Sequence, residues 1–292
     1  MAGVPVEQIT ALTSLLVLPW VFKFLWAPLV DILRSSRWTL RSWIITTQVT
    51  MGVALLPLLF LTLQRDFAVV VPLLLLHAFA AATQDASIDA LSIATVPSSE
   101  RGAINGWMQA GMLAGRSLFG GGALLLTERV GEQAVIALLI AVVWSSMILV
   151  ILSKSETALE MNEASTISRR WSEFFVRFKE VLKQKTTWFG LLFALLSAAG
   201  FEAVGAVAGP YMIDRGISGE QVGFFFAVPV VGGMLSGALI GGYVSDRIGR
   251  KRSVAIFLVL FVVDIMALAA SDVMLGSESG WWIVALLATL YF

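Results

Sequence analysis

Six ionisable side chains interrupt the long apolar stretches of this 292-residue sequence. They are Lys23, Asp85, Asp89, Arg116, Glu202 and Asp264. If these stretches cross a membrane, each charge costs at least about 2.5–3.5 kcal/mol at bilayer depth on insertion scales, so each is a candidate functional residue. Acidic groups in such a place can carry a proton, and basic groups can bind an anion.

Asp85 and Asp89 stand four residues apart and therefore share one face of a helix. Two carboxylates so close oppose each other's ionisation, which favours the uptake of a proton. A second stripe at helical spacing runs along the next apolar stretch and consists of Asn105, Gln109, Met112 and Arg116. Arg116 stays charged and must face an anion, so we expect a cavity in which Arg116 and Lys23 partly balance the two aspartates. The predicted substrate and proton pathway comprises Lys23, Asp85, Asp89, Gln109, Arg116 and Glu202.

Structural roles compete with these functional ones. Asp89 could hold a loop near the end of its helix, and Lys23 could extend to the membrane surface. Glu202 lies beside small residues and could line the cavity or pack, whereas Asp264 has no evident partner in the sequence. His77, the single histidine, fits helix packing better than a proton relay.

The composition excludes an ordinary soluble protein and most catalytic sites. Hydrophobic residues make up 58% and charged residues 14%, with a mean hydropathy of +0.86, whereas soluble domains carry roughly a quarter charged residues. Twenty basic and twenty acidic residues balance, so no nucleic-acid partner is indicated. The absence of cysteine and the single histidine argue against metal sites and nucleophilic triads. We therefore expect no enzyme, metal or cofactor, and no P-loop motif supports ATP-driven transport.

The apolar stretches predict an all-α, polytopic membrane protein. A spanning helix needs about 20 apolar residues to cross a hydrocarbon core roughly 30 Å thick. Eight stretches qualify, near residues ~9–30, ~43–63, ~67–96, ~103–127, ~134–152, ~187–209, ~221–244 and ~253–271. A ninth, from Trp281 to Phe292, stops short of that length. Because the chain begins and stops inside such a pattern, we expect a fragment of a longer polypeptide.

Basic residues predict the orientation in the membrane. Fifteen of the twenty lysines and arginines fall within the loops on one side, while Arg65, Arg129 and Arg215 fall on the other. Since cytoplasmic loops carry the excess of basic residues, the side that contains Asp31 is expected to face the cytoplasm.

A long polar connection separates two groups of spans, from about residue 153 to 186. Its second part places apolar side chains at helical spacing, with arginines and lysines between them. The apolar residues are Trp171, Phe174, Phe175, Phe178, Val181 and Leu182. This pattern predicts an amphipathic helix at the cytoplasmic interface, where packing between two bundles is favoured over lipid sensing.

Two loops repeat one arrangement, an aspartate at the cytoplasmic end of an apolar helix followed by basic residues. The later loop reads SDRIGRKR, whereas the earlier loop has Arg34 three residues after Asp31. Charge pairs at a helix end can form in one conformation and break in another. The predicted conformational-switch residues are Asp31, Asp246, Arg247, Gly249 and Arg250.

The later loop resembles the signature motif of the major facilitator superfamily. A resemblance to the muropeptide permease (AmpG) branch of the peptide/acetyl-CoA transporter family is carried by residues 18–31 (LPWVFKFLWAPLVD), 83–93 (TQDASIDALSI) and 100–122 (ERGAINGWMQAGMLAGRSLFGGG). Facilitators consist of two six-helix halves. The resemblance implies an N-terminal bundle at 1–152 with helices 2–6, a cytoplasmic linker with the amphipathic helix at 153–186, and a partial C-terminal bundle at 187–292 with helices 7–10.

The same resemblance implies a secondary transporter that works by alternating access. Intramembrane carboxylates favour proton coupling, and sodium coupling remains an alternative. The implied cargo is an anhydro-muropeptide, with acetyl-CoA or another small solute as alternatives, and a non-transporting fragment as a third possibility. We expect a monomer in the lipid bilayer of a bacterial inner membrane.

Small residues indicate where helices touch. Gly111 and Gly115 on one span, and Gly233, Gly237 and Gly241 on another, recur every four residues and permit close backbone contact. In the facilitator fold these spans, helices 5 and 8, face each other between the halves. Their glycines could therefore form sliding surfaces, or they could pack within one half.

Overall fold

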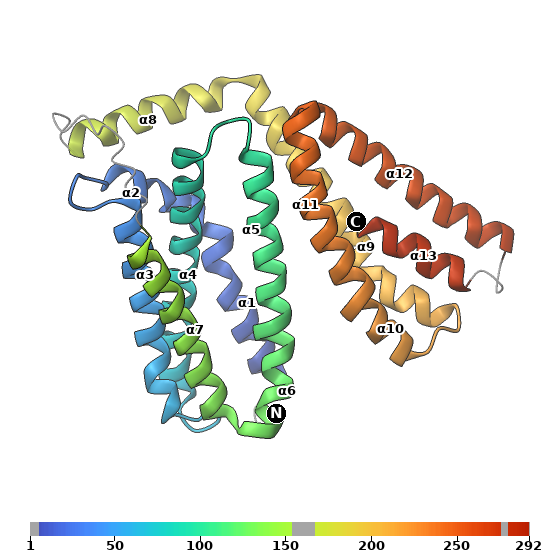
Figure 1. Cartoon of the computed structure of the whole chain (residues 1–292), viewed down its shortest axis with the longest axis horizontal. Helices are drawn as coiled ribbons and strands as arrows, with labels where there is room; N and C mark the ends of the chain where they lie inside the picture. The colour runs from blue at the N-terminus through green and yellow to red at the C-terminus, as the bar shows by residue number, and fades with distance from the viewer. Residues whose placement is uncertain (1–5, 154–166, 276–279, 292) are drawn as a thin grey trace. The chain divides into compact units, whose positions relative to one another are not determined.

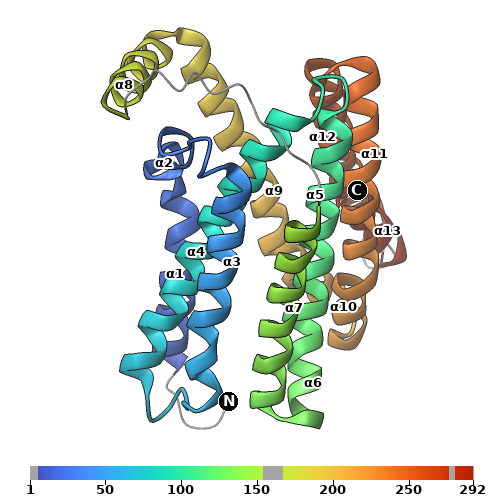
Figure 2. The same cartoon turned by 60° about the vertical axis from the view of Figure 1, so that its left-hand side comes forward.

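The computed structural model describes residues 6–153, 167–275 and 280–291. These residues form helices joined by turns and loops (Figures 1 and 2). The described part of the chain contains no strand. The predicted all-α class is therefore confirmed.

The chain divides into two compact units. The first combines Met1–Val96 with Leu118–Glu173, and the second combines Pro97–Ser117 with Phe174–Phe292. The predicted parts, 1–152, 153–186 and 187–292, follow the chain order. The units instead group Pro97–Ser117 with the later helices, because the helix in this segment packs against one of them. The division into two covalent halves and a linker stays a prediction.

The first unit is a bundle around α3 (Leu40–Leu55). Its other helices are α1 (Val6–Phe22), α2 (Ala27–Ile32), α4 (Phe67–Thr95), α6 (Gly122–Val130), α7 (Glu132–Leu152) and the start of α8 (Ile167–Lys183). α3 packs on both α4 and α7, and a core of Leu55, Leu58, Val70 and Ile140 joins them. α1 and α2 also pack on α4, which brings the N-terminal segment to the face of that helix.

The second unit contains the helix pair α5 (Arg101–Gly115) and α11 (Val231–Ile248). Its other helices are the rest of α8, α9 (Lys185–Asp214), α10 (Gly219–Phe225), α12 (Arg250–Leu275) and α13 (Gly280–Leu290). α5 and α11 run side by side in both views (Figures 1 and 2). A separate core at the other helices includes Met212, Phe225 and Leu287.

Six helical segments among the described residues are long and apolar enough to cross a membrane. They are Leu40–Leu59, Phe67–Thr95, Glu132–Leu152, Lys185–Asp214, Gly219–Ile248 and Arg250–Met274. These segments match six of the eight predicted spans. The first of the other two is interrupted by a 3₁₀ turn at Lys23–Leu25, and the fourth contains a π-helical turn at Arg116–Gly121, as Gly219–Ile248 does at Phe226–Val230.

Proline accounts for the interruption of the first span. Pro28 has no N–H, and its ring clashes with the carbonyl group four residues earlier, so a helix kinks or breaks at such a point. The chain ends α1 at Phe22, makes one tight turn and restarts as α2 with Pro28 in its first helical turn. Lys23 consequently lies on a turn between two helices, where its side chain can approach α4.

His77 contacts a neighbouring helix through its ring. Its Nδ1 atom lies 3.2 Å from the carbonyl oxygen of Met51 on α3. Because a carbonyl oxygen only accepts, Nδ1 carries the proton in this hydrogen bond. Gln48 links α3 to α7 in a similar way, with its Nε2 donating to Ser146 Oγ over 2.9 Å. The geometry favours the helix-packing interpretation of His77 over a proton relay.

Candidate functional site

Lys23 and Asp85 form an ion pair in the first unit. Lys23 Nζ donates a hydrogen bond to Asp85 Oδ2 over 2.6 Å. Lys23 lies on the turn between α1 and α2, and Asp85 lies on α4. Their side chains are 34% and 45% exposed, so neither charged group is enclosed in the packed core of the unit.

Trp26 fixes the turn that carries Lys23. Its indole Nε1 donates to Thr83 Oγ1 on α4 over 3.1 Å, and its ring centroid lies 5.1 Å from that of Phe79. Thr83 stands two residues before Asp85, and its hydroxyl also donates to the Phe79 carbonyl oxygen over 2.7 Å. These contacts hold the turn against α4 and thereby position the lysine at the aspartate.

Asp89 follows Asp85 by one helical turn on α4. Its side chain is exposed, and it has no salt bridge within the described residues. The two carboxylates therefore differ in their surroundings, because Asp85 has a cation beside it at hydrogen-bond distance. The predicted grouping of Lys23, Asp85 and Asp89 on one side of α4 agrees with this geometry.

The other predicted pathway residues lie outside this group. Gln109 is on α5, Arg116 begins the π-helical turn after α5, and Glu202 is on α9. All three side chains are exposed. Arg116 belongs to the second unit and the two aspartates to the first, so their expected pairing stays a prediction.

Two acidic residues of α12 bind neighbouring helices. Asp264, which had no evident partner in the sequence, accepts a hydrogen bond from the Thr289 hydroxyl on α13. Asp272 accepts a hydrogen bond from the Tyr211 hydroxyl over 2.7 Å and forms an ion pair with Arg215. The sequence did not indicate that Asp272, Tyr211 and Arg215 come together. The feature that could have pointed to this contact is Arg215, one of the few basic residues in the loops expected outside.

Asp246 caps the N-terminus of α5 from the end of α11. Its Oδ1 accepts a hydrogen bond from the backbone N–H of Gly102 over 2.8 Å, and its Oδ2 accepts from that of Ala103 over 2.7 Å. The first N–H groups of a helix have no partner within it and carry its positive dipole end, so a carboxylate there is favourable. Glu100, the residue before α5, makes no side-chain cap. The sequence indicated charge pairs in this loop, whereas the aspartate instead binds backbone amides.

The rest of this loop supports the cap. Gly249 ends α11 with φ +90°, a conformation that suits glycine, and this allows the chain to turn directly into α12. Arg250 Nη2 then donates to the carbonyl oxygen of Ser98, just before α5, over 3.1 Å. Arg247 stacks on its own helix, with its guanidinium carbon 4.4 Å from the Tyr243 ring centroid. Asp246, Gly249 and Arg250 thus form the α5–α11 latch.

The earlier loop lacks this geometry. Asp31 is exposed and lies 3.9 Å from Arg34, a weak pair within one helical turn. The carbonyl groups of Ile32 and Arg34 accept hydrogen bonds from Arg170 of α8. Among the described residues, Asp31 caps no helix. This difference agrees with the departure of the earlier loop from the signature spacing.

Glycines allow α5 and α11 to approach closely at the latch. A Cβ atom on Gly102 would overlap Ser245 and Asp246, and one on Gly106 would lie 2.5 Å from the carbonyl oxygen of Ala238. The sequence pointed to Gly111 and Gly115, but a Cβ atom at either position has nothing within 4 Å. The expected contact between these two helices is therefore present, while the expected glycines of α5 were wrong.

The family model described as Major Facilitator Superfamily matches residues 3–292. The chain belongs to the Major Facilitator Superfamily. This membership confirms the predicted family and the polytopic membrane fold, and it identifies a transporter-type protein and not an enzyme.

The chain is also similar in sequence to individual curated proteins. The anhydromuropeptide permease of Escherichia coli (strain K12) is 28% identical over 252 residues, which cover 82% of this chain and 49% of the relative. "Putative transporter AmpG 4" of Rickettsia conorii is 25% identical over 264 residues, covering 87% of this chain and 63% of the relative. An uncharacterized protein of Haemophilus influenzae is 24% identical over 269 residues, covering 89% and 61%. The chain thus spans about half to three fifths of the length of these relatives, and the predicted resemblance to the AmpG branch is confirmed.

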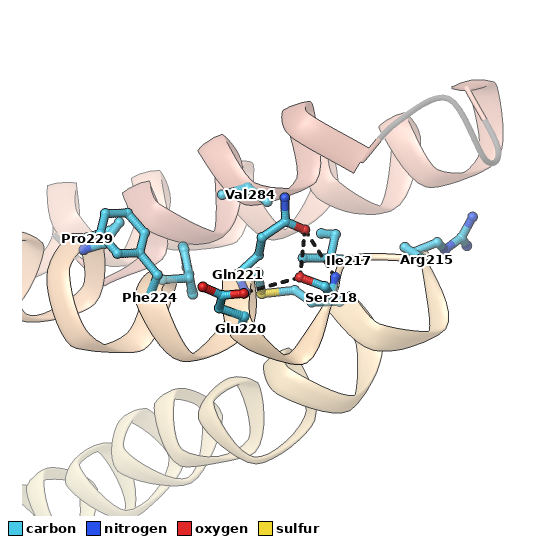
Figure 3. A pocket seen from close by; sticks show the side chains of 11 residues that line it. Arg215, Ile217, Ser218, Glu220, Gln221, Phe224, Pro229 and Val284 are labelled. Carbon is cyan, nitrogen blue, oxygen red and sulfur yellow. Dashed lines mark hydrogen bonds between the residues drawn. The ribbon is translucent and has the colours of Figure 1, made fainter.

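A cavity of about 710 Å³ lies in the second unit of this facilitator chain, between α10 and α13 (Figure 3). Apolar side chains such as Phe224, Phe225 and Val284 line it. Its polar residues Ser218 and Gln221 bond to each other as the capping box of α10, and Arg215 extends away from them. None of the predicted pathway residues lines this cavity. The described residues also contain no cluster of three His, Cys, Asp or Glu side chains that could hold a metal ion.

Gly106→Ala and Gly111→Ala are expected to change the stability of the facilitator chain in opposite directions. At Gly106 the added methyl group meets Ala238, and overpacking of this kind costs about 1–3 kcal/mol. At Gly111 the methyl group meets open space, and the higher helix propensity of alanine adds up to about 1 kcal/mol of stability. Thermal unfolding in detergent, followed by size-exclusion chromatography, measures both. Equal melting temperatures for the two variants would contradict the observed helix contact.

Proposed function

We propose that this facilitator chain belongs to a proton-coupled secondary transporter that works by alternating access. The observation that carries the proposal is the partly exposed Lys23–Asp85 ion pair, with Asp89 one helical turn away. Ionisable groups on an apolar helix are costly in free energy, so their presence indicates a role in binding or coupling. The family membership supports transport, and the site supplies both a proton acceptor and an anion-binding group.

Proton binding at Asp85 couples the ion pair to the cargo. When Asp85 is ionised, it neutralises Lys23 and competes with any anion for the ammonium group. When a proton binds Asp85, the carboxyl group loses its charge and Lys23 can bind a carboxylate of the cargo. Asp89, as a nearby second acid, can exchange the proton with water. Transport then requires the proton and the cargo together, because each favours the bound state of the other.

The α5–α11 latch provides the conformational element. In facilitators, helices 5 and 8 come from opposite halves, and here they correspond to α5 and α11. We infer that the bond of Asp246 to the N-terminus of α5 holds these helix ends together in one access state. Its loss in the other state lets the helices separate. The exposed position of Asp31 supports one strong latch and a weaker counterpart in the earlier loop.

The proposed cargo is an anhydro-muropeptide, taken up across a bacterial inner membrane by a monomeric carrier. The similarity to the anhydromuropeptide permease supports this choice. The site chemistry agrees with it, because Lys23 can bind a peptide carboxylate and the Trp26 ring can stack on a sugar. Acetyl-CoA and other small anions share the negative charge but not the combination of sugar and peptide.

A competition assay distinguishes these cargoes. Proteoliposomes that contain the protein are expected to take up labelled anhydro-muropeptide, and unlabelled anhydro-muropeptide is expected to abolish this uptake. A CoA thioester and a sugar phosphate at equal concentration should leave it unchanged. Competition by the CoA thioester alone would replace the proposed cargo with acetyl-CoA. Absence of uptake for every solute, in protein that is folded, would contradict a transport function.

A further inference from the structure

α8 is a strongly amphipathic helix with no buried residue. On a helical projection Val176 lies on the polar side, and the other seven large apolar side chains of α8 fall within an arc of about 120°. They are Ile167, Trp171, Phe174, Phe175, Phe178, Val181 and Leu182. None of the seventeen residues of α8 is buried, and Phe178 and Val181 are 49% and 46% exposed. The residues of this face are half-buried or exposed, and the exposed part, which includes Phe178 and Val181, requires another apolar environment.

The charges of α8 are sorted around that face. Arg170 and Arg177 lie along one edge of the apolar arc and Lys179 lies along the other, while Glu173 and Glu180 lie on the opposite side of the helix together with Arg169 and Lys183. Basic side chains at the edges can bury their methylene groups among lipid chains and extend their charges to lipid headgroups. Acidic side chains on the far side point to water. This arrangement fits an anionic membrane surface and not the interior of a helical bundle.

The ends of α8 place it at the membrane boundary. Near its start, Arg170 donates to the carbonyl groups of Ile32 and Arg34 in the loop after α2, and the two views agree in placing this part of α8 beside α2 (Figures 1 and 2). At its end, a single residue, Gln184, separates α8 from the membrane-spanning helix α9. The indole of Trp188 on α9 donates to the Leu182 carbonyl oxygen over 2.8 Å and fixes this junction. Both contacts lie on the side where basic residues gather, which is the cytoplasmic side.

We propose that α8 lies in the cytoplasmic leaflet and binds anionic phospholipids through its basic edges. The apolar arc enters the level of the acyl chains, and Arg170, Arg177 and Lys179 contact the phosphate groups. α8 connects the two groups of spans, so its binding to lipid anchors this connection at the membrane surface. This inference concerns the lipid environment and is independent of the cargo and of proton coupling.

The cysteine-free sequence allows a direct test with single labels. Phe178→Cys places a nitroxide label on the apolar arc, and Glu180→Cys places the same label on the opposite side as a matched control. Each labelled protein is reconstituted in vesicles of phosphatidylcholine alone and of phosphatidylcholine mixed with phosphatidylglycerol. Power-saturation spectroscopy then compares collisions of the label with oxygen, which concentrates in lipid, and with a water-soluble nickel complex.

We expect the Phe178→Cys label to favour oxygen over nickel in phosphatidylglycerol vesicles and the Glu180→Cys label to favour nickel in both. Arg177→Gln, combined with Phe178→Cys, should lower the membrane partition of the label about fivefold. Arg169→Gln, which removes an arginine paired with Glu173 over 2.9 Å and away from the arc, should have a smaller effect.

Two results would overturn the inference. A Phe178→Cys label shielded from both reagents in detergent and in every vesicle would show that α8 packs against protein. An equal preference for oxygen with and without phosphatidylglycerol, unaffected by Arg177→Gln, would show that the charges do not bind anionic lipid. Both results leave the proposed transport function untouched, because cargo uptake is not part of the readout.

Discussion

Asp246→Ala is expected to open the α5–α11 latch and to reduce transport strongly. The substitution leaves the backbone N–H groups of Gly102 and Ala103 without their carboxylate partner. Loss of a helix cap costs about 0.5–2 kcal/mol, which at the upper end shifts a two-state equilibrium up to roughly thirtyfold. Asp246→Asn keeps one acceptor oxygen but no charge, so its effect should fall between those of the wild type and Asp246→Ala.

A cysteine at position 110 reports on this opening. Ala110 is 8% exposed and lies on the same face of α5 as Gly102 and Gly106, which contact α11. In an Ala110→Cys protein, the rate of modification by a membrane-impermeant thiol reagent from the cytoplasmic side should rise when Asp246→Ala is added. Asp31→Ala is the matched control, because Asp31 occupies the corresponding loop position without capping a helix in the described structure. If Asp31→Ala raises the rate as much as Asp246→Ala does, the latch does not depend on the observed cap.

Neutralising either partner of the Lys23–Asp85 pair is expected to reduce cargo accumulation at least about tenfold. An unpaired charge at bilayer depth costs on the order of 2.5–3.5 kcal/mol, and the partial exposure of both side chains lowers this to about 1–2 kcal/mol. The expected loss of accumulation exceeds the loss of stability, because Asp85→Asn also removes the proton-binding group and Lys23→Gln removes the cation for the cargo. Uptake of labelled cargo against its gradient measures both losses.

A variant with both substitutions distinguishes a loss of proton coupling from a loss of stability. Lys23→Gln with Asp85→Asn restores neutrality, so the protein should regain the stability that each single variant loses. It should still fail to accumulate cargo, since neither the proton site nor the anion site remains. Lys185→Gln, at the start of α9, removes a lysine outside the ion pair and should retain accumulation. Accumulation at the wild-type level in the double variant would show that the pair only stabilises the bundle.

Much of the fold follows from the sequence because bilayer thickness dictates the length of a spanning helix. Six of the eight predicted spans form helical segments that are long and apolar enough to cross a membrane, and the amphipathic pattern after residue 166 forms α8. The sequence placed Asp246 at a helix junction and predicted charge pairs there, whereas its partners are the backbone N–H groups of Gly102 and Ala103. The cost of unpaired charges predicted that Lys23 and Arg116 partly balance Asp85 and Asp89; Lys23 pairs with Asp85, and the role of Arg116 stays a prediction.

Other features depend on information that residue spacing does not contain. Spacing of four residues identified glycine-containing faces on two helices, but the rotation and offset of the helices decide which glycines touch. The contact therefore occurs at Gly102 and Gly106 and not at Gly111 and Gly115. The binding of Asp272 by Tyr211 and Arg215 joins α9 to α12, and only the folded arrangement brings these residues together.

Cargo-dependent proton uptake is the most direct test of a carrier built around the Lys23–Asp85 pair. A pH-sensitive dye inside proteoliposomes should report acidification when anhydro-muropeptide is added outside, without an imposed proton gradient. Asp85→Asn combined with Asp89→Asn should abolish this signal while the protein remains folded. Acidification that persists in the Asp85→Asn, Asp89→Asn variant would show that the coupling proton binds elsewhere.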